Sequence, residues 1–147
     1  SGRNSSPMRS VQSKKFGYTF NPWSDGKRVF KTSTRGTLAF TAMEQRARTD
    51  SLIAKRLSLF EYGVPEEFYD YEKDPDALFN LIDNPKYSRE IETHRAAMLR
   101  FMRESKDHAL EAFQGRDNPA IVSAYVDGIQ AKADARRKVQ QKLNLNK

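Results

Sequence analysis

Aromatic and polar residues alternate near the start of the chain. Phe16, Tyr18 and Phe20 recur at every second position, which predicts one half-buried face of a strand. Residues 21–26, NPWSDG, follow directly, and their Asn, Pro, Asp and Gly favour a reversal of the chain. Residues 27–31 can then return as the partner strand. The pattern therefore predicts a hairpin whose loop is longer than the tightest type.

The apolar spacing becomes helical after the polar residues 32–36. Thr41 and Glu44 fit a capping box, and Gly63 and Pro65 follow in the order that ends a helix. We therefore expect one helix over residues 40–61. Its apolar stripe consists of Phe40, Met43, Ala47, Ile53, Leu57 and Phe60.

Three Asx-Pro pairs divide the second half of the chain, after an aromatic-rich strand expected at residues 66–72. Each pair supplies an N-cap residue and a proline at the first helical position. The pairs at residues 74–75, 84–85 and 118–119 predict, in order, a short turn, a helix ending near Ser105, and a helix through Ile129.

Two weaker helical signals complete the picture. A helical turn is expected between the last two helices, over residues 109–113. Beyond Ala131 basic residues replace the apolar stripe, so this end is expected to fray or to lean on something outside the chain. The predicted fold class is α+β: a small antiparallel sheet of three to four strands packed against a long helix, with additional C-terminal helices.

The charge is positive overall and unevenly distributed. The net charge is +7, with +9 in residues 1–60, −6 in residues 61–111 and +4 in residues 112–147. The basic first section suits an anion-binding surface, but two oppositely charged sections can equally pack on each other or on a partner. Cysteine is absent, which excludes disulfides, thiolate metal sites and a cysteine nucleophile. No apolar run approaches the length of a membrane-spanning helix.

The sequence offers little catalytic or metal-binding chemistry. His94 falls on the apolar stripe of its helix and is expected to be packed, whereas His108 is expected to be solvated. With no third ligand in view, they do not predict a zinc site. The acidic residues 66–76 lack the glycine and glutamate positions of an EF-hand loop, so a strand edge and a helix cap explain them better.

Three stretches, in the right order, resemble the C-terminal part of sulfatases. Residues 67–81, EFYDYEKDPDALFNL, resemble a signature in which E-L-Y-D-L precedes D-P and N-L. Residues 7–21 resemble the P-x-R-A-V … Y-x-Y-I-x-N passage that begins the subdomain, and residues 84–102 resemble the closing helix. The NPWSDG segment is most similar to the branch of heparan N-sulfatase. Ala77 departs from the pattern, because many sulfatases carry glutamate there.

The resemblance implies three sections and a dependent role. A flexible lead-in over residues 1–7 precedes the sulfatase C-terminal subdomain over residues 8–113 and a basic, helical extension over residues 114–147. In a whole sulfatase this subdomain docks on a large α/β catalytic domain, which carries a formylglycine made from Cys or Ser and a calcium ion. The resemblance gives structural roles to Arg9, Tyr69, Asp70, Asp74, Pro75 and Asn80.

The sulfatase nucleophile pattern C/S-x-P-x-R occurs once, in residues 5–9, SSPMR, but its context is wrong. Met8 stands where sulfatases place a small residue, and no acidic residue precedes Ser5 to hold calcium. We therefore expect no catalytic residue, metal site or cofactor in this chain. The parent enzyme is expected to be exported, as sulfatases of this type usually are.

The hairpin tip is the one candidate for substrate contact. Asn21, Trp23, Lys27 and Arg28 suit a sulfated sugar through ring stacking and charge, although Trp23 can instead plug an interface. Expected partners are the catalytic domain, a sulfated glycan and a second copy of the chain, but neither nucleic acid nor membrane. The alternative function is a free-standing binding module for anionic polysaccharide or nucleic acid, suggested by the basic first section.

Overall fold

A three-stranded antiparallel sheet organises the chain in a computed structural model that describes residues 5–30 and 34–145. Strand β2 (Phe16–Phe20) lies between β1 (Arg9–Gln12) and β3 (Glu66–Asp70). The register places Tyr18 opposite a β1 residue on one side and Phe68 of β3 on the other. The predicted α+β class and small antiparallel sheet are confirmed.

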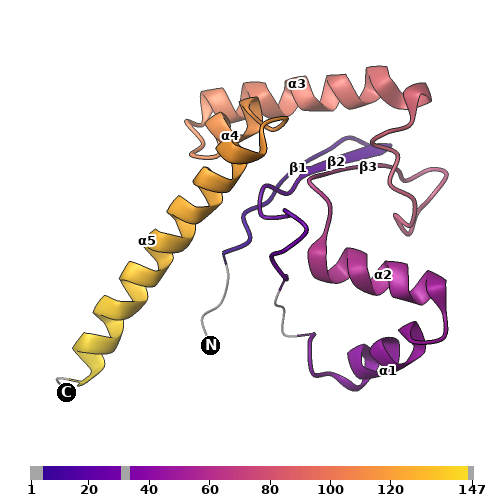
Figure 1. The fold of residues 1–147 in the computed structure, drawn as a ribbon. Coiled ribbons are helices and arrows are strands. Elements are labelled where there is room, and N and C mark those ends of the chain that lie inside the picture. Colours follow the sequence, from indigo (N-terminus) through magenta and orange to yellow (C-terminus); the bar gives the residue numbers. More distant parts are fainter. Residues whose placement is uncertain (1–4, 31–33, 146–147) are drawn as a thin grey trace.

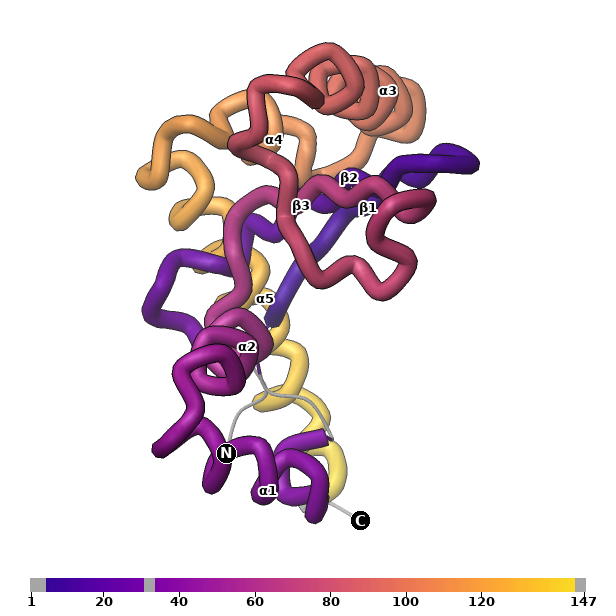
Figure 2. The backbone as a smooth tube through the Cα atoms, turned by 90° about the vertical axis from the view of Figure 1, so that its right-hand side faces the viewer, coloured from indigo at the N-terminus to yellow at the C-terminus, as the bar shows by residue number. Residues whose placement is uncertain are grey.

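Helices lie on both sides of this sheet. Helix α3 and the short α4 cover one side, α1 and α2 lie on the other, and α5 runs from α4 away from the sheet (Figures 1 and 2). Among the described helices, none combines the length and apolarity needed to cross a bilayer. The helices are α1 (Leu38–Ala47), α2 (Ser51–Tyr62), the 3₁₀ helix η1 (Pro85–Tyr87), α3 (Ser88–Glu104), α4 (Leu110–Gln114) and α5 (Pro119–Leu145).

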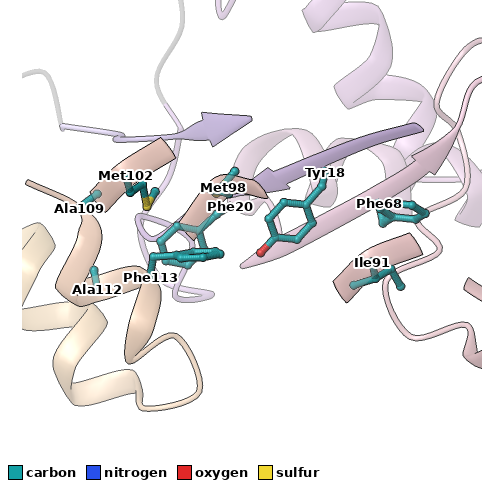
Figure 3. Close-up of a cluster of buried hydrophobic side chains, with 9 residues drawn as sticks. All are labelled: Tyr18, Phe20, Phe68, Ile91, Met98, Met102, Ala109, Ala112 and Phe113. Atoms are coloured by element: carbon teal, nitrogen blue, oxygen red, sulfur yellow. The ribbon is translucent and has the colours of Figure 1, made fainter. Parts of the chain in front are cut away.

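The core forms between the sheet and α3 and α4. The period-two aromatic residues of β2 point to this side, as Figure 3 shows for Tyr18 and Phe20. Tyr18, Phe20 and Phe68 are each at most 1% exposed. Burial of one such side chain contributes about 1.5–3 kcal/mol, so this row anchors the fold. The fully buried partners are Ile91, Met98, Met102, Ala109, Ala112 and Phe113.

The predicted hairpin partner is wrong: β2 pairs with β1 and β3, not with residues 27–31. Because both edges of β2 are occupied, no ladder position remains for a later segment. Asp25 Oδ1 accepts the N–H groups of Lys27 at 2.9 Å and Arg28 at 2.7 Å, which turns the backbone away from the sheet. Residue 31 lies outside the described residues.

The single helix predicted over residues 40–61 is in fact two. The first ends at residue 47, and Asp50 caps the second, because its Oδ1 accepts from Leu52 N at 3.0 Å and Ile53 N at 3.2 Å. The first helix also starts earlier than the capping box suggested, with Thr37 as its N-cap. The two helices pack on each other around Phe40, whose ring lies 5.8 Å from that of Phe60.

The proline-marked helix starts are confirmed. Asn84 Oδ1 accepts from Lys86 N at 3.1 Å, and Asn118 Oδ1 accepts from Ala120 N at 3.0 Å, each beside a proline at the first helical position. The predicted turn at residues 109–113 corresponds to α4. Helix α5, however, continues to residue 145, so the fraying expected beyond Ala131 is not seen.

Two glycines give a matched test of this fold. Gly63 ends α2 at φ 61° and ψ −164°, a region that only glycine adopts readily, and an added Cβ would lie 2.9 Å from two Trp23 ring atoms. Gly63→Ala should lower the free energy of unfolding by about 1–3 kcal/mol. Gly128→Ala, in open space within α5, should raise it by about 0.5–1 kcal/mol. Urea denaturation measures both, and equal effects would contradict the structure.

Candidate functional site

Asn80 completes the hydrogen bonding of the outer edge of β3. Its Oδ1 accepts from Phe68 N at 2.9 Å and Ile82 N at 3.1 Å, and its Nδ2 donates to Glu66 O at 3.1 Å. One side chain therefore supplies the contacts that a fourth strand would otherwise make. This satisfies backbone groups beside the core, where an unmade hydrogen bond costs about 1–3 kcal/mol.

Asp70 fixes the exit from β3. The residue is 1% exposed, and its carboxylate accepts from Tyr87 Oη and from Glu72 N, both at 3.2 Å, while Lys73 Nζ lies 3.6 Å away. Burial by itself favours the neutral acid, but the Tyr87 hydrogen bond and the nearby Lys15 charge outweigh it, so the pKa of Asp70 is lowered.

The remaining signature residues serve the same loop. Tyr69 Oη donates to Glu67 Oε2 at 2.8 Å, and burial raises the pKa of Tyr69. Asp74 Oδ2 accepts from Phe79 N at 2.8 Å, closing the turn that contains Pro75. The carboxylates of Asp70 and Asp74 thus each accept a hydrogen bond from a backbone N–H group of this loop.

Arg9 joins β1 to the loop after α3. Its Nε lies 2.6 Å from Asp107 Oδ2 and its Nη2 lies 2.9 Å from Oδ1, a bidentate ion pair. The Arg9 hydrogen bond lowers the pKa of Asp107, although partial burial opposes the shift. His108 is exposed as expected, but its Nδ1 lies 3.0 Å from Tyr125 Oη.

His94 is the buried histidine that its sequence position indicated. Its Nδ1 lies 2.7 Å from Glu90 O and its Nε2 lies 3.2 Å from Ser13 Oγ. Within the described part of the chain, no three His, Asp or Glu side chains are grouped to hold a metal ion. Ser5 lies against α5, where its N–H donates to Gln130 Oε1 at 2.7 Å.

Asn21 and Trp23 do not form an exposed tip, and the burial of Trp23 follows the alternative in which this ring plugs an interface. They are 2% and 4% exposed. Asn21 Nδ2 donates to Val64 O at 3.0 Å and to Glu67 Oε1 at 2.6 Å, and the Trp23 ring stacks on Phe30 at 5.1 Å. Both side chains therefore pack against the segment between α2 and β3, Asn21 at Val64 and Trp23 at Gly63.

Lys27 and Arg28 remain at the surface. Lys27 is exposed, whereas Arg28 is held by two carboxylates, Asp25 at 2.8 Å and Asp127 of α5 at 2.6 Å. Of the four candidate contact residues, two are therefore buried and two are cations at the surface.

A cavity of about 380 Å³ lies beside this loop. The loop, residues 63–65 and the start of α5 enclose it. Its apolar walls include Pro65, Pro119 and Val122. Ser24, Arg28 and Arg116 add polar groups.

Arg116 reaches a carboxylate that other groups already use. Glu66 Oε1 accepts from Tyr18 Oη and, at 2.9 Å, from Arg95 Nε, while Oε2 accepts from Arg95 Nη2 at 2.7 Å. Arg116 Nε stays 3.5 Å from Glu66 Oε1 and has no hydrogen-bond partner among the described residues. Its guanidinium lies over the Phe113 ring, 5.2 Å from the centroid.

Comparison with known proteins gives a partial similarity, and no protein-family model matches the chain. A delta 4,5-hexuronate-2-O-sulfatase of Bacteroides thetaiotaomicron is 44% identical over 45 residues, which is 31% of this chain. This segment relates the chain to the sulfatases. The match spans 9% of the length of that relative, so the activity in its name belongs to a much longer protein.

Arg116 is a residue of the candidate site that sequence reasoning missed. It stands in the turn before the Asn118 cap, beyond the segments that resemble sulfatases. A single arginine in a turn carries no signal of its own. Only the fold brings it beside Glu66 and the loop that contains Arg28.

The Arg9–Asp107 pair predicts a specific pH dependence. An aspartate whose folded pKa lies below its unfolded value of about 3.9 stabilises the fold above that value and loses the contribution as pH falls through the folded pKa. Asp107→Asn should therefore cost about 1–3 kcal/mol at pH 7. The deficit should shrink below about pH 4.

Urea titrations of wild type and variant across pH 2–7 measure this difference (roughly the range in which carboxylates titrate). Asp117→Asn, an exposed acid in the next loop, is the matched control and should have little effect at any pH. A deficit for Asp107→Asn that does not change with pH would contradict the ion pair.

Proposed function

We propose that this chain is the C-terminal structural subdomain of a sulfatase, completing a catalytic domain that carries the chemistry. The 45-residue similarity to a sulfatase carries the proposal, and the C-terminal position rests on the resemblance of residues 7–21, 67–81 and 84–102. We further propose that the parent enzyme belongs to the branch of heparan N-sulfatase, which residues 21–26 resemble. Export from the cytoplasm would follow from the same relationship.

The use of the signature residues supports a structural role. Asp70, Asp74 and Asn80 each accept hydrogen bonds from neighbouring backbone N–H groups, Asp70 also accepts from Tyr87, and Arg9 donates to Asp107 and to Met8 O. A catalytic constellation would instead need groups aimed at a shared substrate position.

Calcium and formylglycine, the groups a sulfatase uses, do not fit this chain. The chain lacks cysteine, and the described acids are not grouped as a metal site. Ser5, in the nucleophile-like pattern, contacts Gln130 rather than an acidic cluster. Sulfate-ester cleavage is therefore assigned to the catalytic domain.

Exposed apolar side chains on α1 and α2 support a docking role. Leu38 is 90% exposed, Leu52 61% and Leu59 41%, and α2 has no buried residue. A stable helix of a globular protein usually buries one face, so an apolar surface left open indicates an interface. We propose the catalytic domain as its partner, and expect the separate chain to self-associate.

Self-association tests the docking surface. Sedimentation velocity of the separate chain should show oligomers that grow with concentration, because open apolar surface favours association. The variant Leu38→Glu/Leu52→Glu should shift the chain toward monomer. Leu143→Glu, equally apolar and exposed on α5, is the control and should not. A wild-type chain that stays monomeric throughout would contradict the proposed surface.

Activity tests the assignment of chemistry. The purified chain, supplied with calcium, should not hydrolyse 4-nitrocatechol sulfate above the rate of buffer alone. Hydrolysis that a chelator abolishes would overturn the proposal.

A binding module for anionic polymers is the second candidate, favoured by the +9 charge of residues 1–60. In such a module, affinity for heparin would fall steeply with salt. The structural role predicts that the chain leaves a heparin column at low salt. Retention well above physiological ionic strength would instead favour the module.

A further inference from the structure

The cavity beside the loop of residues 21–28 combines apolar walls with an incompletely paired arginine. We propose that it binds a single anionic sugar residue, whose carboxylate or sulfate group contacts Arg116. The choice of a sugar rests on the proposed sulfatase function. The choice of an anion rests on the electrostatics of this chain.

Arg116 carries a positive charge that the fold leaves poorly compensated. Its side chain is 21% exposed, and its nearest carboxylate, Glu66, already accepts three hydrogen bonds from Tyr18 and Arg95. Two guanidiniums therefore share one carboxylate, and Arg116 holds the longer contact, 3.5 Å. Partly buried charges are usually paired, so this site favours an additional anion.

The terminal nitrogens of Arg116 are available for such a contact. Nη1 makes only a long hydrogen bond, 3.3 Å, to Phe113 O. Nε is buried and faces Glu66 at 3.5 Å, so Nη1 and Nη2 are the nitrogens left for a ligand, and Nη2 makes no hydrogen bond among the residues that the structure describes. A guanidinium with these donors suits a carboxylate or sulfate oxygen pair.

Neighbouring charges limit the ligand to one anionic group at this position. Arg28 also lines the cavity, but Asp25 and Asp127 already neutralise it. Asp25 itself lies on the cavity wall and would repel a second negative group nearby. The start of α5, at Pro119, adds a weak positive potential on the same side as Arg116.

The size and lining favour a sugar ring over a lone acidic side chain. The volume of about 380 Å³ falls within the range of small-molecule sites. Pro65, Pro119 and Val122 offer apolar surface to the C–H face of a ring. The hydroxyl groups of Ser24 and Ser123 donate to Tyr62 O and Asp127 Oδ2, so each offers only an acceptor lone pair to a sugar hydroxyl. A single carboxylate side chain would reach Arg116 but leave these walls uncovered.

Titration of the ¹⁵N-labelled chain with methyl β-D-glucuronide, followed by NMR, tests the proposal directly. We expect shifts confined to the cavity, at the amides of Ser24, Gly63 and Val122 and at the Arg116 Nε–H. Methyl β-D-glucoside, the same ring without the charge, should bind at least about tenfold more weakly, as expected for loss of a charge-assisted hydrogen bond.

Two variants separate the charge from the cavity. Arg116→Gln should weaken glucuronide binding about tenfold or more, whereas Arg103→Gln, an exposed arginine on α3, should leave it unchanged. Val122→Trp keeps Arg116 but fills the cavity, and should also abolish the shifts. If Arg116→Gln fails to fold, the wild-type shift map and Val122→Trp decide the question.

Several outcomes would overturn the proposal. Shifts that map to the basic half of α5, or binding of the uncharged glucoside with equal affinity, would reject the site. Equal affinity for inorganic sulfate or for an acetyl-aspartate amide would reject the sugar as the ligand. Because these measurements use neither hydrolysis nor self-association, their failure would leave the structural role of the subdomain standing on its own tests.

Discussion

The packing of the β2 aromatic row against α3 and α4 is the interaction on which the rest of this structure depends. Tyr18 and Phe20 are buried between the sheet and these helices, and Phe68 of β3 extends the same surface. Because β2 is hydrogen-bonded on both edges, its side chains cannot slip by one position without exposing the whole row. The strand therefore fixes the positions of both neighbouring strands and of α3.

The position of β2 also determines what the polar residues of the 67–81 signature do. Once β3 is held by β2, its other edge and its exit need partners, and Asn80 and Asp70 supply them. Arg9 similarly ties β1 to the loop that follows α3. In three dimensions, Asp70 and Asn80 thus hold neighbouring backbone groups.

The same packing creates an electrostatic imbalance at one end of the sheet. Glu66, at the start of β3, lies where α3 brings Arg95 and the turn after α4 brings Arg116. Buried ionic groups are stable only when well paired, and here two cations meet one carboxylate. This imbalance lies beside the cavity next to α5, whereas the apolar side chains that we propose for docking belong to α1 and α2. The chain thus has two surfaces with different physical character.

The sequence determined the elements whose signals are local. The period-two aromatics of β2 and the Asx-Pro caps before η1 and α5 depend on neighbouring residues only, so they could be predicted without the fold. The tertiary structure decided what depends on distant partners. β2 pairs with β1 rather than with residues 27–31, because β3 takes its second edge.

The candidate site divides in the same way. The turn-rich loop of Asn21 and Trp23 left open whether Trp23 lies at an exposed tip or plugs an interface, because burial is set by residues some forty positions later, around Gly63. Arg116 gave no local signal, and its importance arises only from a carboxylate fifty residues earlier, at Glu66. Local patterns thus determined β2 and the Asx-Pro helix starts, whereas charge balance and burial, which depend on which distant residues meet, were decided by the fold alone.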